Sequence, residues 1–354
     1  FKQKTAYEIR LSLVGSEMCI RDRPKDIIMQ ITRRRLVQTG LAGATFGAPF
    51  VVRAQVAREL KIGLITGPSH NWTQAMQSFS EALKKESGGR LSAAVFPAGQ
   101  LGNEATMIQQ MQTGALDMGF LTLAEFSNRN ANFGAFFAPY LTRDVSHAAK
   151  VLKGKEAATV LDQLSDQGLA GLGFGLGGMR HVLSRAAAPN AAALKGKKFR
   201  ITPFAPLRDF YQFAGIVPTP IPLPGLFDAL ANGQIDGADV DLELVWTLKL
   251  FQQAKHLVLT KHMMFPVVSV MSGRVFAGMS QPDRQLVRRV MAVELDKLFA
   301  KYAQAEGEWL TQIRGTGIEV LQVGREFFGD VASAWEKHWS PSAPSLPKLR
   351  AEAA

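Results

Sequence analysis

Short apolar runs alternate with longer amphipathic stretches along the chain from about residue 59. The segments Glu59–Ile65 and Leu91–Phe96 are aliphatic and of strand length, so each predicts a β-strand. Between them, apolar residues recur at helical spacing and predict a helix that ends at Gly88. Ser69 and Asn71 are the residues expected to cap its N-terminus.

The same alternation continues through the rest of the chain. Extended segments are predicted at Asp117–Leu121, Leu169–Phe174, Lys198–Thr202, Val217–Pro222, Asp236–Val240, His256–Thr260 and Val267–Val275. Helices are predicted around Met107, at 144–164, at Phe204–Ala214, at Leu226–Ala231 and at 281–314. Strands that alternate with helices indicate an α/β fold with mostly parallel sheets. The elements form two successive sets, which favours two lobes.

A glycine-rich stretch separates these two sets. Gly173, Gly175 and Gly178 spell G-x-G-x-x-G, the pattern of dinucleotide-binding loops. Such a loop must join a strand to a long helix, with an acidic residue about twenty positions later. Here the following segment is short, and a basic cluster that includes Arg200 stands where the acid is expected. The favoured interpretation is a flexible crossover that serves as a hinge, and an exported NADP-linked oxidoreductase is the alternative.

The N-terminal segment has the pattern of processing signals. Residues 1–28 resemble translated sequencing-adaptor sequence and are interpreted as an artefactual extension. In residues 29–54, a Thr-Arg-Arg-Arg-Leu-Val motif precedes an apolar run and a Val-Arg-Ala site that ends at Ala54. That order predicts a twin-arginine signal peptide, removed on export to the periplasm.

Charge and cysteine content narrow the chemistry. The formal net charge is +11, but +6 of it lies within residues 1–54 and the remaining basic residues form no runs, so nucleic acid is not an expected partner. The only cysteine is Cys19, and the six histidines have no metal-ligand spacing. No nucleophile–base pair or phosphate loop stands out either. We therefore predict a binding protein, not an enzyme, with no metal and no cofactor.

Several motifs together resemble one family. In chain order they read VFPAGQLG, MIQQMQTGALDMGF, FAPYLTRDVSHAAKVLKG, GGMRHVLS, LKGKKFRI, LANGQIDGADVD and TKHMMFPVVSV. Over residues 58–340 this order and spacing resemble the DctP-like solute-binding proteins of tripartite ATP-independent periplasmic (TRAP) transporters. The resemblance implies a two-lobed periplasmic-binding-protein-like fold with a hinge. The lobes would close over an organic acid and deliver it to small and large membrane subunits.

The resemblance also implies an order of domains. Residues 55–176 would form the first part of lobe I, and residues 177–265 would form lobe II. The chain would then return to lobe I over residues 266–340. This last segment would include a long helix spanning both lobes and a C-terminal helix. Residues 341–354 would be a flexible tail.

The candidate ligand-binding residues follow from the same resemblance. The family's carboxylate-binding arginine lies in the strand after LKG-x-K, here Arg200, and a second lies in the G-x-R motif, here Arg180. A guanidinium group pairs with a carboxylate through two parallel hydrogen bonds, which lysine cannot reproduce. Each arginine could instead be a surface residue. The further candidates are Asn71, Trp72, Phe120, Phe204, Asp239, Val240 and Trp246.

Two positions depart from the family pattern. Val240 stands where many relatives have a ligand-binding asparagine, and Gly225 stands where many have a glutamate. Asp239 and Asp241 remain nearby and could bind a hydroxyl or an amine, or could belong to a solvated loop. The apparent loss of two polar groups favours a monocarboxylate with an apolar or hydroxylated body over a sugar acid.

Overall fold

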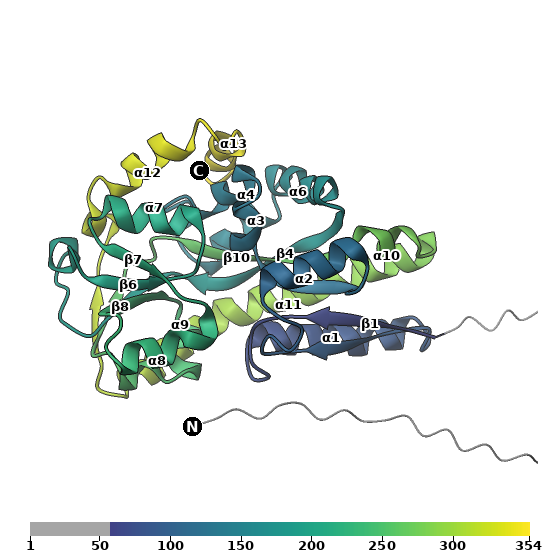
Figure 1. The fold of residues 1–354 in the computed structure, drawn as a ribbon, viewed down its shortest axis with the longest axis horizontal. Helices are drawn as coiled ribbons and strands as arrows, with labels where there is room; N and C mark the ends of the chain where they lie inside the picture. The colour runs from purple at the N-terminus through teal and green to yellow at the C-terminus, as the bar shows by residue number, and fades with distance from the viewer. Residues whose placement is uncertain (1–56) are drawn as a thin grey trace, which may run out of the picture. The chain divides into compact units, whose positions relative to one another are not determined.

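The computed structural model describes residues 57–354. These residues form two separate β-sheets, which differ in strand order, and helices pack around them (Figure 1). The first sheet has the order β2-β1-β3-β10-β4 and the second has the order β11-β9-β5-β8-β6-β7. The strands are β1 Arg58–Gly63, β2 Leu91–Phe96, β3 Met118–Thr122, β4 Leu169–Met179, β5 His181–Ser184, β6 Lys198–Ile201, β7 Val217–Pro220, β8 Gly237–Val240, β9 His256–Leu259, β10 Met264–Ser272 and β11 Glu319–Gln322. The predictions for 1–28 and 29–54 lie outside the described residues.

Both sheets mix parallel and antiparallel pairs. In the first, β1 is parallel to β2 and β3, whereas β10 is antiparallel to β3 and β4. In the second, β5 is antiparallel to both of its neighbours, and the other pairs are parallel. Five of the nine strand pairs in residues 57–354 are parallel, so the expectation of mostly parallel sheets holds only narrowly. The antiparallel strands are those by which the chain enters one lobe from the other, a connection that periodicity does not reveal.

The helices mostly follow the predicted segments. They are α1 Asn71–Glu86, α2 Glu104–Thr113, α3 Leu123–Ser127, α4 Ala131–Gly134, α5 Val145–Leu152, α6 Lys155–Asp162, α7 Ala205–Phe213, α8 Leu226–Ala231, α9 Leu242–Thr247, α10 Gly273–Ala277, α11 Gln281–Arg314, α12 Val331–Trp339 and α13 Ser345–Glu352. The predictions for α8 and α11 are confirmed. The single helix predicted at 144–164 is wrong, because Gly154 separates α5 from α6. None of the described helices is long and apolar enough to cross a membrane.

Helix α11 connects the two lobes (Figure 1). Its Leu295 belongs to the core of the first lobe, and its Ile313 belongs to the core of the second. Along its length it packs against α1 and β4 of the first lobe and against α9 of the second. The predicted helix spanning both lobes is thereby confirmed.

The glycine-rich stretch forms most of strand β4, so it is not the flexible crossover that the sequence suggested. A Cβ on Gly173 would lie 2.6 Å from Leu295 Cδ1 of α11, and a Cβ on Gly177 would lie 2.6 Å from Trp72 Cζ2. Here glycine allows a helix and a tryptophan to approach the strand closely. The chain crosses to the second lobe just afterwards, past Gly178, whose φ of +89° favours glycine. The next element is β5 and not a long helix, which removes the context of a dinucleotide-binding loop.

The C-terminal part of the chain differs from the expected domain order. Strand β11 pairs with β9 in the second sheet, so residues 266–340 contribute to both lobes. Residues 341–354 do not form a flexible tail, because α13 buries Leu346 and Leu349 in the core of the first lobe.

Candidate functional site

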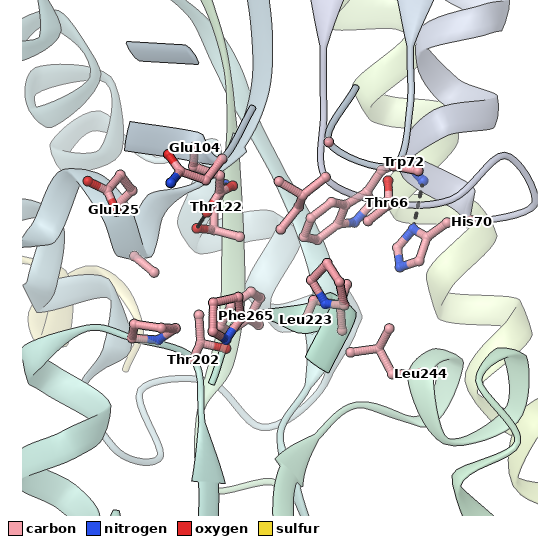
Figure 2. A pocket seen from close by; sticks show the side chains of 18 of the residues that line it. Thr66, His70, Trp72, Glu104, Thr122, Glu125, Thr202, Leu223, Leu244 and Phe265 are labelled. Carbon is pink, nitrogen blue, oxygen red and sulfur yellow. Dashed lines mark hydrogen bonds between the residues drawn. The ribbon is translucent and has the colours of Figure 1, made fainter. Parts of the chain in front are cut away.

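A cavity of about 490 Å³ lies between the lobes, at the carboxyl ends of strands from both sheets. The ends of β2 and β3 in the first lobe lead to Ala98 and Thr122, and the ends of β6 and β8 in the second lead to Thr202 and Asp241. Figure 2 shows Thr122 and Thr202 facing each other from opposite lobes. Open α/β sheets place their ligand sites at such strand ends.

Arg180 lies at the crossing between lobes and is held by two carboxylates. Its Nε donates to Asp239 Oδ1 at 2.5 Å, and its Nη1 donates to Asp241 Oδ2 at 2.9 Å. The ring of Phe265 lies 4.5 Å from the guanidinium carbon, in cation–π geometry. Arg180 is 1% exposed and borders the cavity. Its charge is therefore already balanced by the protein.

Asp239 is the centre of this buried network. Besides Arg180, its Oδ2 lies 3.0 Å from His262 Nε2 and accepts from the Tyr211 hydroxyl at 3.1 Å. Burial alone would raise the pKa of Asp239, but the Arg180 charge and the His262 hydrogen bond hold it at about 2. Asp241 caps α9, where its Oδ1 accepts from Leu244 N at 2.9 Å. Burial raises the pKa of Asp241 against the opposing effect of Arg180.

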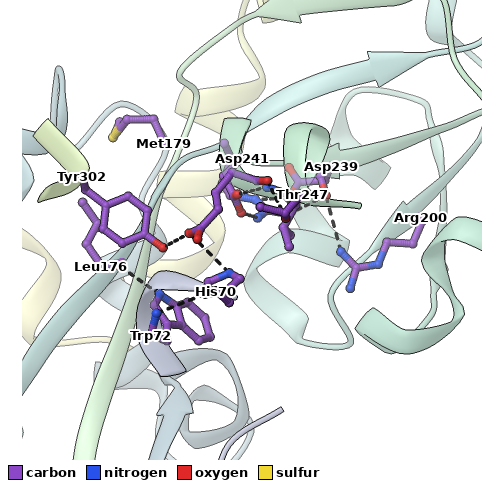
Figure 3. Close-up of polar contacts among 12 residues, drawn as sticks. His70, Trp72, Leu176, Met179, Arg200, Asp239, Asp241, Thr247 and Tyr302 are labelled. Carbon is purple, nitrogen blue, oxygen red and sulfur yellow. Dashed lines mark hydrogen bonds and ion pairs between the residues drawn. The ribbon is translucent and has the colours of Figure 1, made fainter. Parts of the chain in front are cut away.

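Arg200 lies close to Arg180 but has no carboxylate partner within residues 57–354. Its Nε donates to the Ile221 carbonyl at 2.8 Å and its Nη1 to the Asp239 carbonyl at 3.5 Å, a contact drawn in Figure 3. Arg200 is 2% exposed and lines the cavity. Burial, together with the Arg180 charge, lowers the pKa of Arg200 to about 9. An anion in the cavity would relieve both effects.

The first lobe contributes hydrogen-bond acceptors to the cavity, and Figure 2 shows Glu104, Thr122 and Glu125 among its lining side chains. Glu104 accepts from the Thr122 backbone and from the Thr122 hydroxyl, each at 2.6 Å. Burial raises its pKa to about 7 in spite of these bonds. Burial also raises the pKa of Glu125, which lines the same wall. Each oxygen of Glu104 keeps a second lone pair, so this wall can accept hydrogen bonds from a ligand.

The apolar part of the cavity comes from both lobes. Trp72 and Phe265 line it together with Leu223, Leu244 and prolines of the second lobe. Trp72 Nε1 donates to the Leu176 carbonyl at 3.1 Å, which fixes the indole ring against β4. The cavity thus combines a cationic end, an acceptor wall and an apolar surface.

The structure brings only some of the predicted residues to the cavity. Arg200, Arg180 and Trp72 line it, and their contact with a ligand stays a prediction. The other candidates do not line it: Asn71, Phe120, Phe204, Asp239, Val240 and Trp246. Most are buried in one lobe, whereas Trp246 is half-buried and stacks on Phe251. The cap of α1 was also misassigned, because His70 Nδ1 accepts from Trp72 N.

Sequence reasoning missed Glu104, Glu125, Thr122, His70 and Phe265. Glu104 and Glu125 read as ordinary acidic residues in the first turns of short helices. Each begins or lies in the helix that follows a strand, β2 for Glu104 and β3 for Glu125, and the carboxyl ends of parallel strands lie at one edge of a sheet, so this order along the chain was the available signal. Their convergence on one cavity depends on strand order, which the sequence does not give.

A family model described as bacterial extracellular solute-binding protein, family 7, matches residues 62–342. The chain belongs to this family. Among curated relatives, the 2,3-diketo-L-gulonate-binding periplasmic protein YiaO of Escherichia coli K12 is 29% identical over 287 residues, covering 80% of this chain and 87% of that protein. The family consists of solute-binding proteins and not enzymes, so the oxidoreductase alternative is wrong.

Solved structures share the fold of this family 7 protein. A TRAP solute-binding protein from Bordetella bronchispeptica, with density interpreted as pantoate, has a TM-score of 0.79 and 26% identity, covering 84% of this chain and 99% of that chain. One from Xanthobacter autotrophicus Py2, with bound β-D-galacturonate, has a TM-score of 0.78 and 26% identity, covering 83% and 98%. The two-lobed α/β fold with its spanning helix is thereby confirmed.

Proposed function

We propose that this protein binds an organic acid that carries one carboxylate and several hydroxyl groups, and that it does so in the periplasm for a TRAP transporter. The carboxylate would pair with Arg200. The observation that carries this proposal is the buried guanidinium of Arg200, which borders the cavity without a carboxylate partner among the described residues. A buried charge is stable only when it is paired, so the ligand would supply the missing partner.

The rest of the cavity supports a hydroxylated ligand. Glu104, Glu125 and Thr122 offer acceptors opposite Arg200, and ligand hydroxyls are their natural donors. The preference against sugar acids, which was based on Val240 and Gly225, therefore loses its support. Relatives named for, or solved with, a uronate, a diketogulonate and pantoate fit the same class. Among residues 57–354, Arg200 is the cavity arginine without a carboxylate partner, and a single such guanidinium favours one carboxylate over two.

A thermal unfolding panel tests the ligand class. D-Galacturonate, L-gulonate, pantoate, succinate and NADP are each added to the purified protein. A ligand at about 100 times its Kd should stabilise the protein by about 2.7 kcal/mol. D-Galactose and pantolactone are matched controls that lack the carboxylate, and neither should raise the melting temperature. Stabilisation by galactose as strong as that by galacturonate would contradict a carboxylate site at Arg200.

Periplasmic location and delivery to TRAP membrane subunits rest on the relatives, several of which are named periplasmic binding proteins. Osmotic-shock fractionation of cells tests the first part. The wild-type chain should appear in the periplasmic fraction at mature size, and replacing Arg33, Arg34 and Arg35 by lysine should retain the precursor. Retention of the wild-type chain in the cytoplasm would contradict export.

A further inference from the structure

Beside the cavity, a carboxylate of the second lobe contacts the first lobe. Glu243 lies in α9, and its Oε1 accepts from the backbone N–H of Asn71 at 2.8 Å, at the start of α1. Its Oε2 accepts from the hydroxyl of Tyr302, on the helix that spans both lobes. Figure 3 shows the side chains of Tyr302 and His70, which come from the spanning helix and from the start of α1. Glu243 is 2% exposed and does not line the cavity.

His70 lies beside this carboxylate, and a hydrogen bond orients its ring. Its Nδ1 accepts from Trp72 N at 3.2 Å, so the proton of the neutral ring lies on Nε2. Nε2 is 3.4 Å from Glu243 Oε2. Burial lowers the pKa of His70 to about 3, so the ring is neutral at physiological pH. The Glu243 carboxylate therefore accepts hydrogen bonds from the start of α1 in the first lobe and from the spanning helix, and the neutral His70 ring lies 3.4 Å away.

These contacts can form only while the lobes are together. Asn71 and His70 belong to the first lobe, whereas Glu243 is carried by the second, and opening the cavity would separate them. In the open form the Asn71 N–H would return to the unpaired state common to the first turn of a helix. The carboxylate contributes to holding the lobes closed without contacting the ligand.

We propose that Glu243 acts as a latch, with Asn71, His70 and Tyr302 as its receptor, that holds the closed form and slows the release of the bound ligand. This proposal rests on the proposed function, since it assumes that ligand is captured by closure of the lobes. Glu243 would set how long the ligand stays bound, and the groups that line the cavity would set which ligand is bound.

The latch also predicts a pH dependence. Burial raises the pKa of Glu243 to about 7, with Asp241 adding to the shift and the Tyr302 hydrogen bond, the Asn71 N–H and the Lys301 charge opposing it. In the open form the side chain meets water and has an ordinary pKa near 4.3. Closure therefore takes up a proton between these values, and affinity should fall as pH rises from about 5 to 7.

Stopped-flow release of D-galacturonate and of pantoate tests the latch. Glu243→Ala should speed release about tenfold, as expected for loss of the hydrogen bond that a charged carboxylate accepts from the Asn71 N–H of the other lobe. Glu243→Gln keeps the shape and an acceptor for Asn71, so it should release at about the wild-type rate but lose the part of the pH dependence that arises at position 243. Glu104 titrates in the cavity of both proteins, so the difference between them isolates Glu243.

Matched variants separate the latch from the binding site and from folding. Glu308→Ala removes an exposed carboxylate of α11 and should change nothing, while Tyr302→Phe should speed release by a smaller factor than Glu243→Ala. Unchanged release in Glu243→Ala, alongside lost binding in Arg200→Met, would overturn the latch alone. Unchanged binding in Arg200→Met would overturn the proposed function instead.

The latch can also be tested on ligand-free protein, which is needed if neither D-galacturonate nor pantoate binds or if Glu243→Ala is unstable. Small-angle scattering of Glu243→Gln and Tyr302→Phe at pH 5 and pH 8 then replaces the kinetics. Wild-type protein should become more extended at pH 8, and Glu243→Gln should change less. An identical pH response in both proteins would overturn the latch.

Discussion

The two arginines at the cavity have the same burial and opposite surroundings. Both donate to the backbone carbonyl of Asp239, and neither is more than 2% exposed. Arg180 is paired with Asp239 and Asp241, whereas Arg200 has no carboxylate partner in the described chain. Burial alone thus does not distinguish an arginine that the protein already neutralises from one that we propose to bind the ligand. The counterions make the distinction.

The strongest test of this comparison is removal of the paired arginine. Arg180→Met would leave Asp239 and Asp241 buried without their cation, so we expect the free energy of unfolding to fall by about 3–5 kcal/mol. Urea denaturation of the ligand-free protein measures it. Arg314→Met, at an exposed position of α11, is the control and should change stability little. A loss below about 1 kcal/mol would mean that the two carboxylates do not depend on Arg180.

The opposite outcome is expected at Arg200. Arg200→Met removes an unpaired buried charge and keeps most of the side-chain volume, so the free protein should be as stable as wild type or more stable. Ligand affinity should fall by about 2–5 kcal/mol, which is roughly 30- to several-thousand-fold. Calorimetric titration and urea denaturation of the same sample measure both. A destabilised variant with normal affinity would reverse the roles assigned to the two arginines.

The sequence predicted one side of this comparison and not the other. Periodicity placed α8 and α11 correctly, and the motif around LKGKKFRI singled out Arg200. The pairing of Arg180 depends on Asp239 and Asp241, which lie about sixty residues away and reach it only through the neighbouring strands β5 and β8. The sequence analysis singled out Arg180 and the two aspartates separately, but no pattern indicated that the aspartates neutralise Arg180.

The acceptor wall escaped sequence reasoning for a related reason. Glu104 and Glu125 lie on separate helices, and each has a local role that explains an acidic residue there: a helix first turn and an i,i+4 pair with Arg129. Likewise the glycines of β4 looked like a hinge, because close packing against α11 leaves no local signal. Sequence patterns indicate interactions between residues that are close in the sequence, whereas the cavity between the lobes is lined by residues that are far apart in it.

A smaller effect is expected at the acceptor wall. The pKa of Glu104 is raised to about 7 in the folded protein and is near 4.3 when unfolded. The stability from this raised pKa is present below pH 4 and is lost as pH rises through 7. As pH rises from 4.5 to 7.5, wild type should lose this stability and Glu104→Gln should not. The free energy of unfolding of Glu104→Gln relative to wild type should therefore increase by about 1–3 kcal/mol over that range. Urea denaturation across that range measures the gain, and a constant difference would contradict the shift.

The smallest expected effect tests whether a change in the hydrogen bonds around Arg180 and Asp239 alters ligand binding at Arg200. Tyr211→Phe removes one donor to Asp239, which keeps Arg180 and His262, so stability should fall by about 1 kcal/mol. Tyr211 does not line the cavity, and affinity should stay within about twofold, because the hydrogen bonds of Arg200 go to backbone carbonyls and not to the Asp239 side chain. Urea denaturation and calorimetric titration measure the two quantities. An affinity loss larger than the stability loss would mean that Asp239 positions both arginines, and the division between a structural and a ligand-binding guanidinium would no longer hold.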